Sequence, residues 1–427
     1  MKITQLLAKI LPEKQSVSPD LNYEVAITLR DLPREVSVLV VASFFVAVGF
    51  GIIVPAIPLF ARSFGVSNAA VGLIISLFAL SRFASGLFSG KLVDRFGERT
   101  VFAVGVAFVA LSVGACGIAQ SYNQLLFFRA AGGLGSSMFS VAASSVILRS
   151  VSDAQRGHAM SVYNGSFLLG AIAGPAIGGG LAAISLRAPF FVYAIALSAA
   201  GTVGFFFFTS EHLQAPKKSE EKKVAMSLRD AFALKGYRYA LIITFVASWV
   251  IFGVRTSILP LFITEQLKST AAVVGWGFTI SAVIQGTLIL RAGRLSDERG
   301  RRFVLIIGTT ISFIGVVIMT LTLNPLMFFA SMAIIGLGNA FLASAPATIV
   351  GDLIEGKGGQ VIAVFQMAGD AGMIVGPVVV GFIADHYGYR AAFGLSGLVF
   401  CIAIVLSIKM PETRKSRASH EIIDPLN

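Results

Sequence analysis

Long uninterrupted runs of apolar residues dominate the chain, and short segments that hold most of the charged residues separate them. A helix needs about 20 apolar residues to cross the ~30 Å hydrocarbon core of a bilayer. The strands of a membrane β-barrel would instead be alternating segments of about 10 residues. The pattern therefore predicts twelve membrane-spanning helices, at residues 37–61, 68–90, 100–119, 123–148, 157–184, 189–208, 239–264, 271–293, 303–323, 325–350, 359–384 and 390–410.

Three short sequences recur in the same order in the two halves of the chain. The pairs are residues 90–99 and 293–302, residues 174–176 and 376–378, and residues 58–60 and 260–262, separated by 203, 202 and 202 positions. This regular spacing predicts a duplicated unit of six helices. Because six is an even number, both units would run in the same direction through the membrane. The predicted fold class is an all-α membrane protein of two parallel six-helix repeats.

A polar segment between the sixth and seventh predicted helices divides the two repeats. It contains Pro216, two lysine pairs and a pair of glutamates between them, a composition typical of a solvated linker. The predicted organisation is an N-terminal tail (1–36), a six-helix bundle (37–208), a linker (209–238), a second six-helix bundle (239–410) and a C-terminal tail (411–427).

Composition and charge agree with a membrane protein and fix its expected orientation. Only 13% of the residues are charged, whereas a soluble protein carries about 25%, which excludes a soluble enzyme. Of the 34 Lys and Arg residues, 27 lie in the two tails and in segments on the same side of the predicted helices. Basic residues mark the cytoplasmic side. We therefore expect a multi-pass protein of the cell membrane with both termini cytoplasmic. The net charge of +12 then indicates no nucleic-acid partner.

The segment after the second predicted helix reads Gly-x-x-x-Asp-Arg-x-Gly-x-Arg, and a second copy follows the eighth. The residues are Gly90, Asp94, Arg95, Gly97 and Arg99, then Gly293, Asp297, Gly300, Arg301 and Arg302. This pattern resembles the signature of the major facilitator superfamily, and the resemblance extends over residues 37–410. It implies that glycines allow a sharp reversal while Asp and Arg latch neighbouring helix ends. Glu98 stands where the family usually has a basic residue. The alternative is a basic loop that only sets topology.

Two further motifs extend the resemblance into the membrane. Arg129, in the fourth predicted helix, resembles an embedded arginine that the family links to proton transfer. The fifth helix resembles the motif of the drug/proton antiporter branch, which has 12 helices, at Gly170, Gly174, Pro175, Gly178 and Gly179. Small residues at every fourth position also form a packing face between helices, and both interpretations stay open.

Four ionisable residues lie well inside predicted helices, namely Arg82, Arg129, Arg255 and Asp370. Each costs ~2.5–3.5 kcal/mol to insert, so a polar pathway is the default interpretation, and a structural ion pair or snorkelling is the alternative. Asp370 is the only carboxylate in any predicted span. It lies about 15 Å along its helix and Arg82 about 12 Å from the same side, so the two could pair across the halves. Asp370, Arg82 and Arg129 are the predicted proton-coupling residues.

In the family, the first, fourth, seventh and tenth helices line a central cavity. The resemblance therefore places Arg129 and Arg255 toward the substrate, with Phe50, Trp249 and Phe252 among the aromatic candidates. Many drug/proton antiporters carry an acidic residue in the first helix, but this chain has none between Glu35 and Asp94. Three embedded arginines against one aspartate favour an anionic or zwitterionic substrate.

The predicted function is secondary active transport by alternating access, with proton-coupled efflux of a small amphipathic or anionic organic molecule. The alternatives are an organic-anion importer or facilitated-diffusion carrier on the same fold, and a membrane receptor that transports nothing. The sequence has no phosphate-binding loop for ATP, and its four histidines have no metal-ligand spacing. We therefore expect no enzymatic activity, cofactor or metal, and a monomer whose partners are its substrate, protons and the bilayer.

Overall fold

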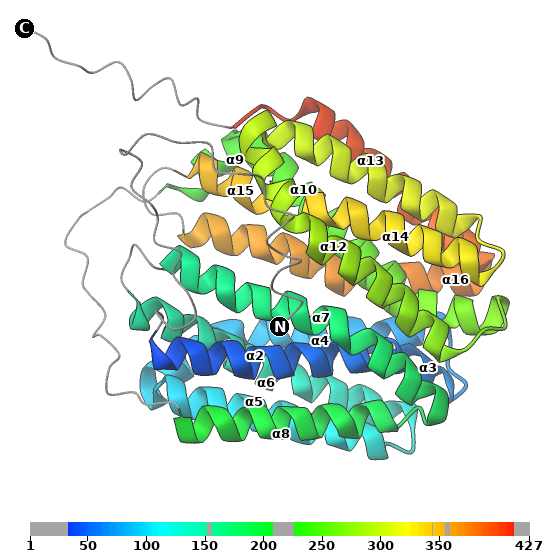
Figure 1. The fold of residues 1–427 in the computed structure, drawn as a ribbon, viewed down its shortest axis with the longest axis horizontal. Helices are drawn as coiled ribbons and strands as arrows, with labels where there is room; N and C mark the ends of the chain where they lie inside the picture. The colour runs from blue at the N-terminus through cyan, green and yellow to red at the C-terminus, as the bar shows by residue number, and fades with distance from the viewer. Residues whose placement is uncertain (1–32, 152–155, 208–225, 344, 355–358, 414–427) are drawn as a thin grey trace, which may run out of the picture.

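A computed structural model describes residues 33–151, 156–207, 226–343, 345–354 and 359–413, and the regular elements in these residues are helices (Figure 1). Ten helical stretches are long and apolar enough to cross a membrane. One of them, Gln360–Lys409, contains two helices that meet at Gly388, and Ala188–Thr202 is a shorter apolar helix. The all-α membrane fold is therefore confirmed. Most of the two predicted tails and of the linker lies outside the described residues.

The first half of the chain forms the lower group of helices in Figure 1. Within it, α2 packs on α7 and α8, and α6 packs on α4 and α5. The first span is broken after Ile53, immediately before Pro55, so that two helices replace the single predicted one. The helices of this group are α2 (Arg34–Ile53), α3 (Ala56–Arg62), α4 (Asn68–Phe96), α5 (Glu98–Ile118), α6 (Tyr122–Ser150), α7 (Arg156–Ile184) and α8 (Ala188–Phe207).

The second half of the chain forms the upper group, which contacts the first group mainly where α4 packs on α16 and α7 packs on α12. Its seventh-span helix is interrupted by two π-helical stretches, η2 and η3. The elements are α9 (Leu228–Ala233), α10 (Lys235–Ser248), η2 (Trp249–Ile258), α11 (Leu259–Leu261), η3 (Phe262–Gln266), α12 (Ala271–Arg299), α13 (Arg301–Thr320), α14 (Pro325–Leu342), α15 (Ala345–Leu353) and α16 (Gly359–Lys409).

The helices run between two ends of the molecule, which we call the tail end and the far end. The tail end holds the beginning of α2, the end of α8, the beginning of α9 and the end of α16 (Figure 1). The far end holds the turns α3–α4, α5–α6 and α7–α8, as well as the bend at Gly388. The first and last described helices therefore begin and end on the same side, as an even number of spans requires.

Two helices continue beyond their apolar runs into the charged motifs. The predicted spans ended at Gly90 and Gly293, but α4 continues to Phe96 and α12 to Arg299. Arg, Lys and Glu are good helix formers in water, so a helix can continue beyond its apolar segment. A prediction from runs of apolar residues finds only the part of the helix that lies in the membrane. The expected reversal therefore occurs at Gly97 and Gly300, which have φ values of 77° and 99°. Gly90 and Gly293 lie inside helices.

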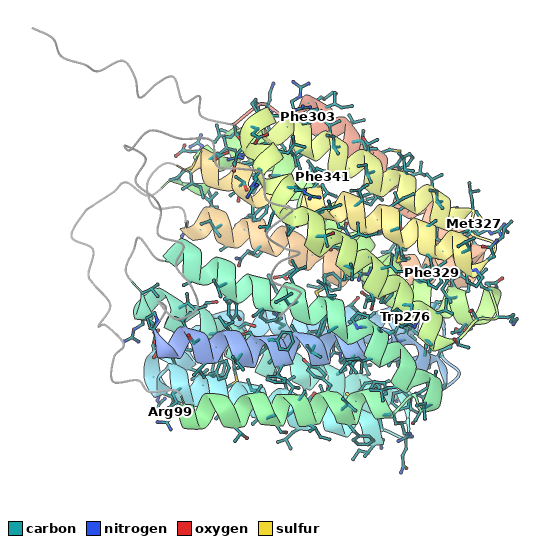
Figure 2. The ribbon with its side chains drawn as sticks, viewed as in Figure 1. Arg99, Trp276, Phe303, Met327, Phe329 and Phe341 are labelled. Carbon is teal, nitrogen blue, oxygen red and sulfur yellow. The ribbon has the colours of Figure 1, made fainter. Side chains whose placement is uncertain are left out.

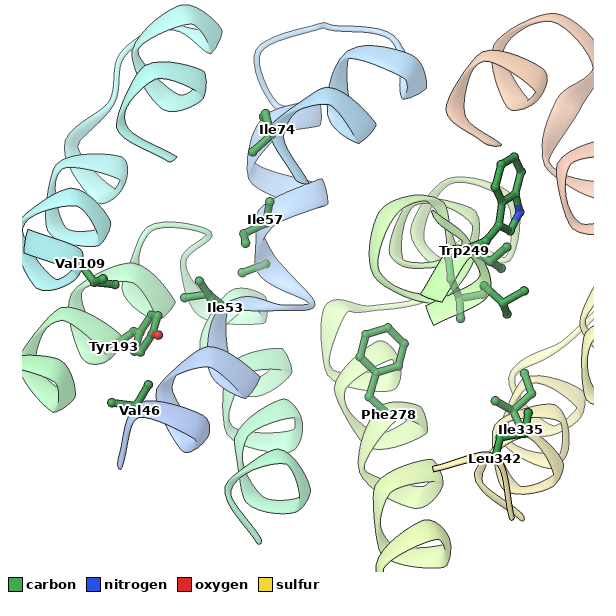
Figure 3. Close-up of a cluster of buried hydrophobic side chains, with 14 of the residues drawn as sticks. Val46, Ile53, Ile57, Ile74, Val109, Tyr193, Trp249, Phe278, Ile335 and Leu342 are labelled. Atoms are coloured by element: carbon green, nitrogen blue, oxygen red, sulfur yellow. The ribbon is translucent and has the colours of Figure 1, made fainter. Parts of the chain in front are cut away.

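Buried apolar side chains fill the interior of both groups. Figure 3 shows Val46, Ile53 and Tyr193 in one part of this core and Phe278 and Ile335 in another. The outer surface is also apolar: Trp276 is 58% exposed, and Figure 2 shows Phe303 on the outside of the upper group. Contiguous exposed apolar side chains on this scale indicate contact with lipid.

The glycine motif of the fifth span forms a close helix contact. Gly170, Gly174 and Gly178 lie on the α7 face that packs on α2, and a methyl group on Gly174 would lie 2.5 Å from the carbonyl oxygen of Val48. Gly179 faces the other half of the chain, where a methyl group would lie 2.8 Å from the Cα of Gly275. Pro175 lies inside α7. The motif therefore serves helix packing both within the first group and between the groups.

Candidate functional site

A cavity of about 1100 Å³ lies between the two groups of helices. Its walls come from α2, α4, α5, α6, α7 and α8 on one side and from α10, η2 and α16 on the other. Its charged lining residues are Arg82, Arg129 and Asp370. A volume of this size suits a drug-sized organic molecule. Three of the four predicted intramembrane charges therefore meet in one space.

The cavity occupies the middle of the molecule and its tail-end half. On α7 it is lined by Tyr163 and Phe167, and on α16 by residues between 365 and 373, all nearer the tail end of those helices. At the far end the groups are in close contact, because a methyl group on Gly72 would lie 2.2 Å from the carbonyl oxygen of Pro377. The far end is therefore closed in this conformation.

A small apolar cluster forms the boundary between the cavity and the closed far end. Phe78, Ala79 and Met373 are buried there, with Phe252 and Ile374 packed against them. Phe78 and Met373 are also the cavity-lining residues nearest the far end on α4 and α16. These side chains come from both halves of the chain, so the cluster separates the cavity from the far end only while the halves are together.

Aromatic side chains form much of the cavity wall. Phe50 and Phe252, predicted as substrate contacts, both lie there. The nine aromatic lining residues are Phe50, Phe78, Phe83, Phe139, Tyr163, Phe167, Tyr193, Phe252 and Phe365. Such rings provide large apolar contact areas and faces that attract cations or stack on flat ligands.

Arg129 is the buried cation of the cavity. It projects from α6, is 5% exposed, and places its guanidinium 3.9 Å from the centre of the Phe78 ring. Its Nε is buried without a hydrogen-bond partner, and among the described residues no carboxylate forms an ion pair with it. The ring compensates only part of the cost of burying this charge. Arg129 is therefore available to a negatively charged group in the cavity.

Hydroxyl groups line the cavity on α6, and they were not among the residues predicted from the sequence. Ser136, Ser140 and Ser144 recur at every fourth position and so lie on one face of the helix. Thr244 and Ser248 do the same on α10. This spacing was visible in the sequence, but serines are common in membrane helices and their facing could not be assigned. They supply hydrogen bonds for the polar part of a ligand.

Asp370 and Arg82 face the same cavity from opposite halves, as their depths predicted. Asp370 is half-buried on α16, whereas Arg82 is exposed on α4. Within the part of the chain that the structure describes, the two form no direct ion pair in this conformation.

Two predicted substrate contacts lie outside this cavity. Arg255 lines a separate pocket inside the second group together with Ser312 and Asn339, and its guanidinium lies 4.9 Å from the centre of the Phe278 ring. Trp249 is buried and donates a hydrogen bond to Ser396 at 3.2 Å. The structure therefore does not bring Arg255 and Arg129 to one ligand. Both outlying residues belong to η2, whose π-helical turns change which side chains face the cavity.

In the two charged motifs at the tail end, Arg301 and Arg95 contact residues of their own halves. Arg301 pairs with Asp297 and donates to Asp352 at 3.1 Å, while Glu412 accepts from the backbone N–H of Arg301 at 2.9 Å and of Arg302 at 3.2 Å. In the first copy Asp94 is exposed, and Arg95 lies 5.3 Å from the centre of the Phe96 ring. Arg99 lies in the first turn of α5 (Figure 2).

Glu98, the residue at which this chain departs from the family signature, forms a hydrogen bond and an ion pair. It is 3% exposed, accepts a hydrogen bond from Ser145 at 2.9 Å, and pairs with Arg149 at the end of α6. As the first residue of α5 it also lies at the positive end of that helix. The acidic residue thus fastens the tail ends of α5 and α6 together.

Glu98→Lys is expected to destabilise the protein by ~2 kcal/mol, because a second cation would face Arg149 at a buried position. Thermal unfolding of the purified protein in detergent measures the effect. The double variant Glu98→Lys with Arg149→Glu restores opposite charges and should recover most of the loss. An unfolding temperature for Glu98→Lys equal to that of the wild type would contradict a structural role for the pair.

Comparisons with known proteins agree with this geometry. The family model described as Major Facilitator Superfamily matches residues 39–268 and 240–423. Multidrug resistance protein MdtG of Proteus mirabilis is 29% identical over 381 residues, which cover 85% of this chain and 92% of that protein. The multi-drug resistance efflux pump PmrA homolog of Lactococcus lactis is 26% identical over 386 residues, covering 88% and 94%.

Among solved structures, a bacterial homolog of the human lysosomal transporter Spinster, inward-facing and unoccupied, superposes with a TM-score of 0.74. It is 16% identical, and the match covers 90% of this chain and 98% of that one. The predicted resemblance is therefore confirmed, and the chain belongs to the Major Facilitator Superfamily of membrane transporters.

Proposed function

We propose that this transporter exports a small amphipathic organic molecule with a negative or zwitterionic group, in exchange for protons. The observation that carries the proposal is Arg129, a buried cation that faces a cavity of about 1100 Å³ and has no carboxylate partner among the described residues. A ligand anion would complete the charge balance there, and the aromatic wall would hold its apolar body. The relatives named for multidrug resistance and efflux support the outward direction.

The proposed cycle is alternating access between two bodies, the six-helix bundles 37–208 and 239–410, in a monomer of the cell membrane. The tail end is proposed to be cytoplasmic, on the strength of the 27 basic residues on that side. The described conformation would then receive substrate from the cytoplasm, because its cavity occupies the tail-end half. Export would require the tail end to close and the far end to open.

Proton coupling is proposed to run through Asp370 with Arg82. The two face each other across the halves without a direct ion pair among the described residues, so relative movement of the halves would change their separation. An adjacent arginine stabilises the carboxylate, whereas burial without a partner favours its protonated form. Conformation and proton occupancy would therefore be linked.

Ligand-induced thermal stabilisation of the purified transporter tests the substrate class. At a concentration of 100 times Kd, a ligand of the folded state adds about 2.7 kcal/mol of stability. We expect aromatic organic anions and zwitterions to raise the unfolding temperature in a saturable way, and organic cations of the same size to raise it less. Stabilisation by organic cations alone would contradict the proposed charge preference. For a ligand that binds, substrate-driven proton movement in proteoliposomes then separates exchange from uncoupled diffusion.

A further inference from the structure

A cluster of polar contacts joins the two halves of the chain at the far end, outside the cavity. It involves Arg62 and Asn68 from the first half and Glu265, Asp385 and Tyr389 from the second. None of these residues was singled out from the sequence as a functional residue. All of them lie beyond the apolar cluster that bounds the cavity, on the side that is closed.

Asp385 caps a helix of the opposite half. Its Oδ1 accepts a hydrogen bond from the backbone N–H of Asn68 at 2.7 Å, and its Oδ2 accepts from that of Ala69 at 2.9 Å. These groups belong to the first turn of α4, where N–H groups lack partners within the helix and the helix dipole is positive. Caps are ordinarily supplied by the preceding residues, and Ser67 supplies only one here, to Ala70. A carboxylate 317 residues away therefore completes the cap.

Glu265 makes a second connection across the same seam. Its Oε1 accepts from Nε of Arg62 at 2.7 Å, and its Oε2 lies 2.6 Å from the Tyr389 hydroxyl. That hydroxyl also lies 3.1 Å from Oδ1 of Asn68. Tyr389 is buried, so the contacts of its hydroxyl are shielded from water and are stronger than they would be on an open surface. The side chains of Arg62 and Glu265 are 37% and 31% exposed, so their ion pair is only partly shielded.

The sequence around Asp385 is a third copy of the charged motif. Residues 381–390 have Gly, Asp, Gly and Arg at the same spacing as residues 90–99 and 293–302. The backbone agrees, because Gly388 has φ 83° and ψ 165°, close to the 77° and 159° of Gly97 and the 99° and 158° of Gly300. Gly381 permits the close approach, since a methyl group there would lie 2.5 Å from the carbonyl oxygen of Asn68. This copy lies at the opposite end of the molecule from the other two.

We propose that Asp385 and Glu265 form a far-end latch. The latch holds the two halves together at the far end in the described conformation, which we call tail-open, and it must release before the far end can open. Asp385 accepts two hydrogen bonds from the other half, whereas the described residues show none to Asp94 of the first copy, at the tail end. The negative charge of each latch carboxylate strengthens the hydrogen bonds that it accepts from the other half. Removing the charge should therefore weaken the closed far end without touching the cavity or Asp370. The inference rests on alternating access, but it is independent of substrate and of proton coupling.

Distances between spin labels across the halves test the latch without any transport assay. One pair, at Gln120 and Leu323, reports on the far end, and a second pair, at Phe96 and Arg299, reports on the tail end; all four residues are exposed. The labels are placed in a background with Cys116 and Cys401 replaced by serine. Asp385→Asn should lengthen the far-end distances and shorten the tail-end distances, with the far-open population rising about tenfold.

Two further variants make the outcome decisive. Glu265→Gln should shift the distances in the same direction and serves as the test if Asp385→Asn does not fold. Arg390→Gln changes an exposed charge of the same motif copy and should leave both distance distributions unchanged. Unchanged distances in Asp385→Asn and Glu265→Gln, or a shift toward the tail-open state, would overturn the latch. Because no substrate is present, such a failure leaves the proposed substrate and proton exchange untouched.

Discussion

Arg129→Met is expected to weaken binding of an anionic substrate by about 30-fold or more, equivalent to roughly 2 kcal/mol. The substitution removes the cation at the buried end of the cavity and leaves the ligand's negative group without its partner. Arg129→Lys keeps the charge but loses the planar fork of donors, so its affinity should fall between the two. Equilibrium binding to the purified protein measures all three dissociation constants.

Protein stability separates this binding role from a structural one. If Arg129 served the fold alone, its removal would lower the unfolding temperature of the ligand-free protein. An uncompensated buried charge is costly, so Arg129→Met should instead be at least as stable as the wild type without ligand. Arg255→Met is the matched control, since it removes a second buried guanidinium that lies outside the cavity. Equal affinities for Arg129→Met and the wild type would exclude the proposed anion contact.

The sequence predicted the spans well because lipid imposes a simple rule on them. A helix in hydrocarbon must be apolar over its whole crossing, so composition alone marks it. The same rule identified Asp370, since a carboxylate at membrane depth has to be explained. The rule says nothing about the parts of α4 and α12 that project into water, and it therefore ended those helices six residues early at Gly90 and Gly293.

The direction in which a side chain faces was harder to predict than its depth. Each residue turns an α-helix by about 100°, so a short irregular stretch moves later side chains to another face. Arg255 and Trp249 lie in such a stretch, the π-helical η2, and face the interior of the second group instead of the cavity. Partners distant in sequence, such as Arg149 for Glu98 and Asn68 for Asp385, have no local signature at all.

Asp370→Asn is expected to lower proton-driven transport by about tenfold or more while changing substrate affinity by less than about twofold. Asparagine has nearly the size of aspartate but cannot exchange a proton, and Asp370 is the only carboxylate that lines the cavity in the described part of the chain. Transport driven by a pH gradient and counterflow at equal pH, both in proteoliposomes, measure the two properties separately. Counterflow should persist, because it requires only that the loaded transporter reorient.

Gln366 provides the matched control, because it lies one helical turn from Asp370 on the same wall of the cavity. Gln366→Ala removes a polar contact and is expected to change affinity, but the transport that remains should keep the pH dependence of the wild type. Full proton-driven transport by Asp370→Asn would leave the carboxylate with a structural role only. The exchange mechanism would then have lost its only candidate among the described cavity residues.

Arg82 gives the coupling hypothesis a second, independent test. The Arg82 and Asp370 side chains face one cavity from opposite halves, so Arg82→Gln should change the pH dependence of proton-driven transport without abolishing transport. In the Asp370→Asn background, Arg82→Gln should change the remaining transport no further, since no proton remains for Arg82 to influence. Two residues that act on one proton must be non-additive in this way, whereas two independent structural residues would give effects that add.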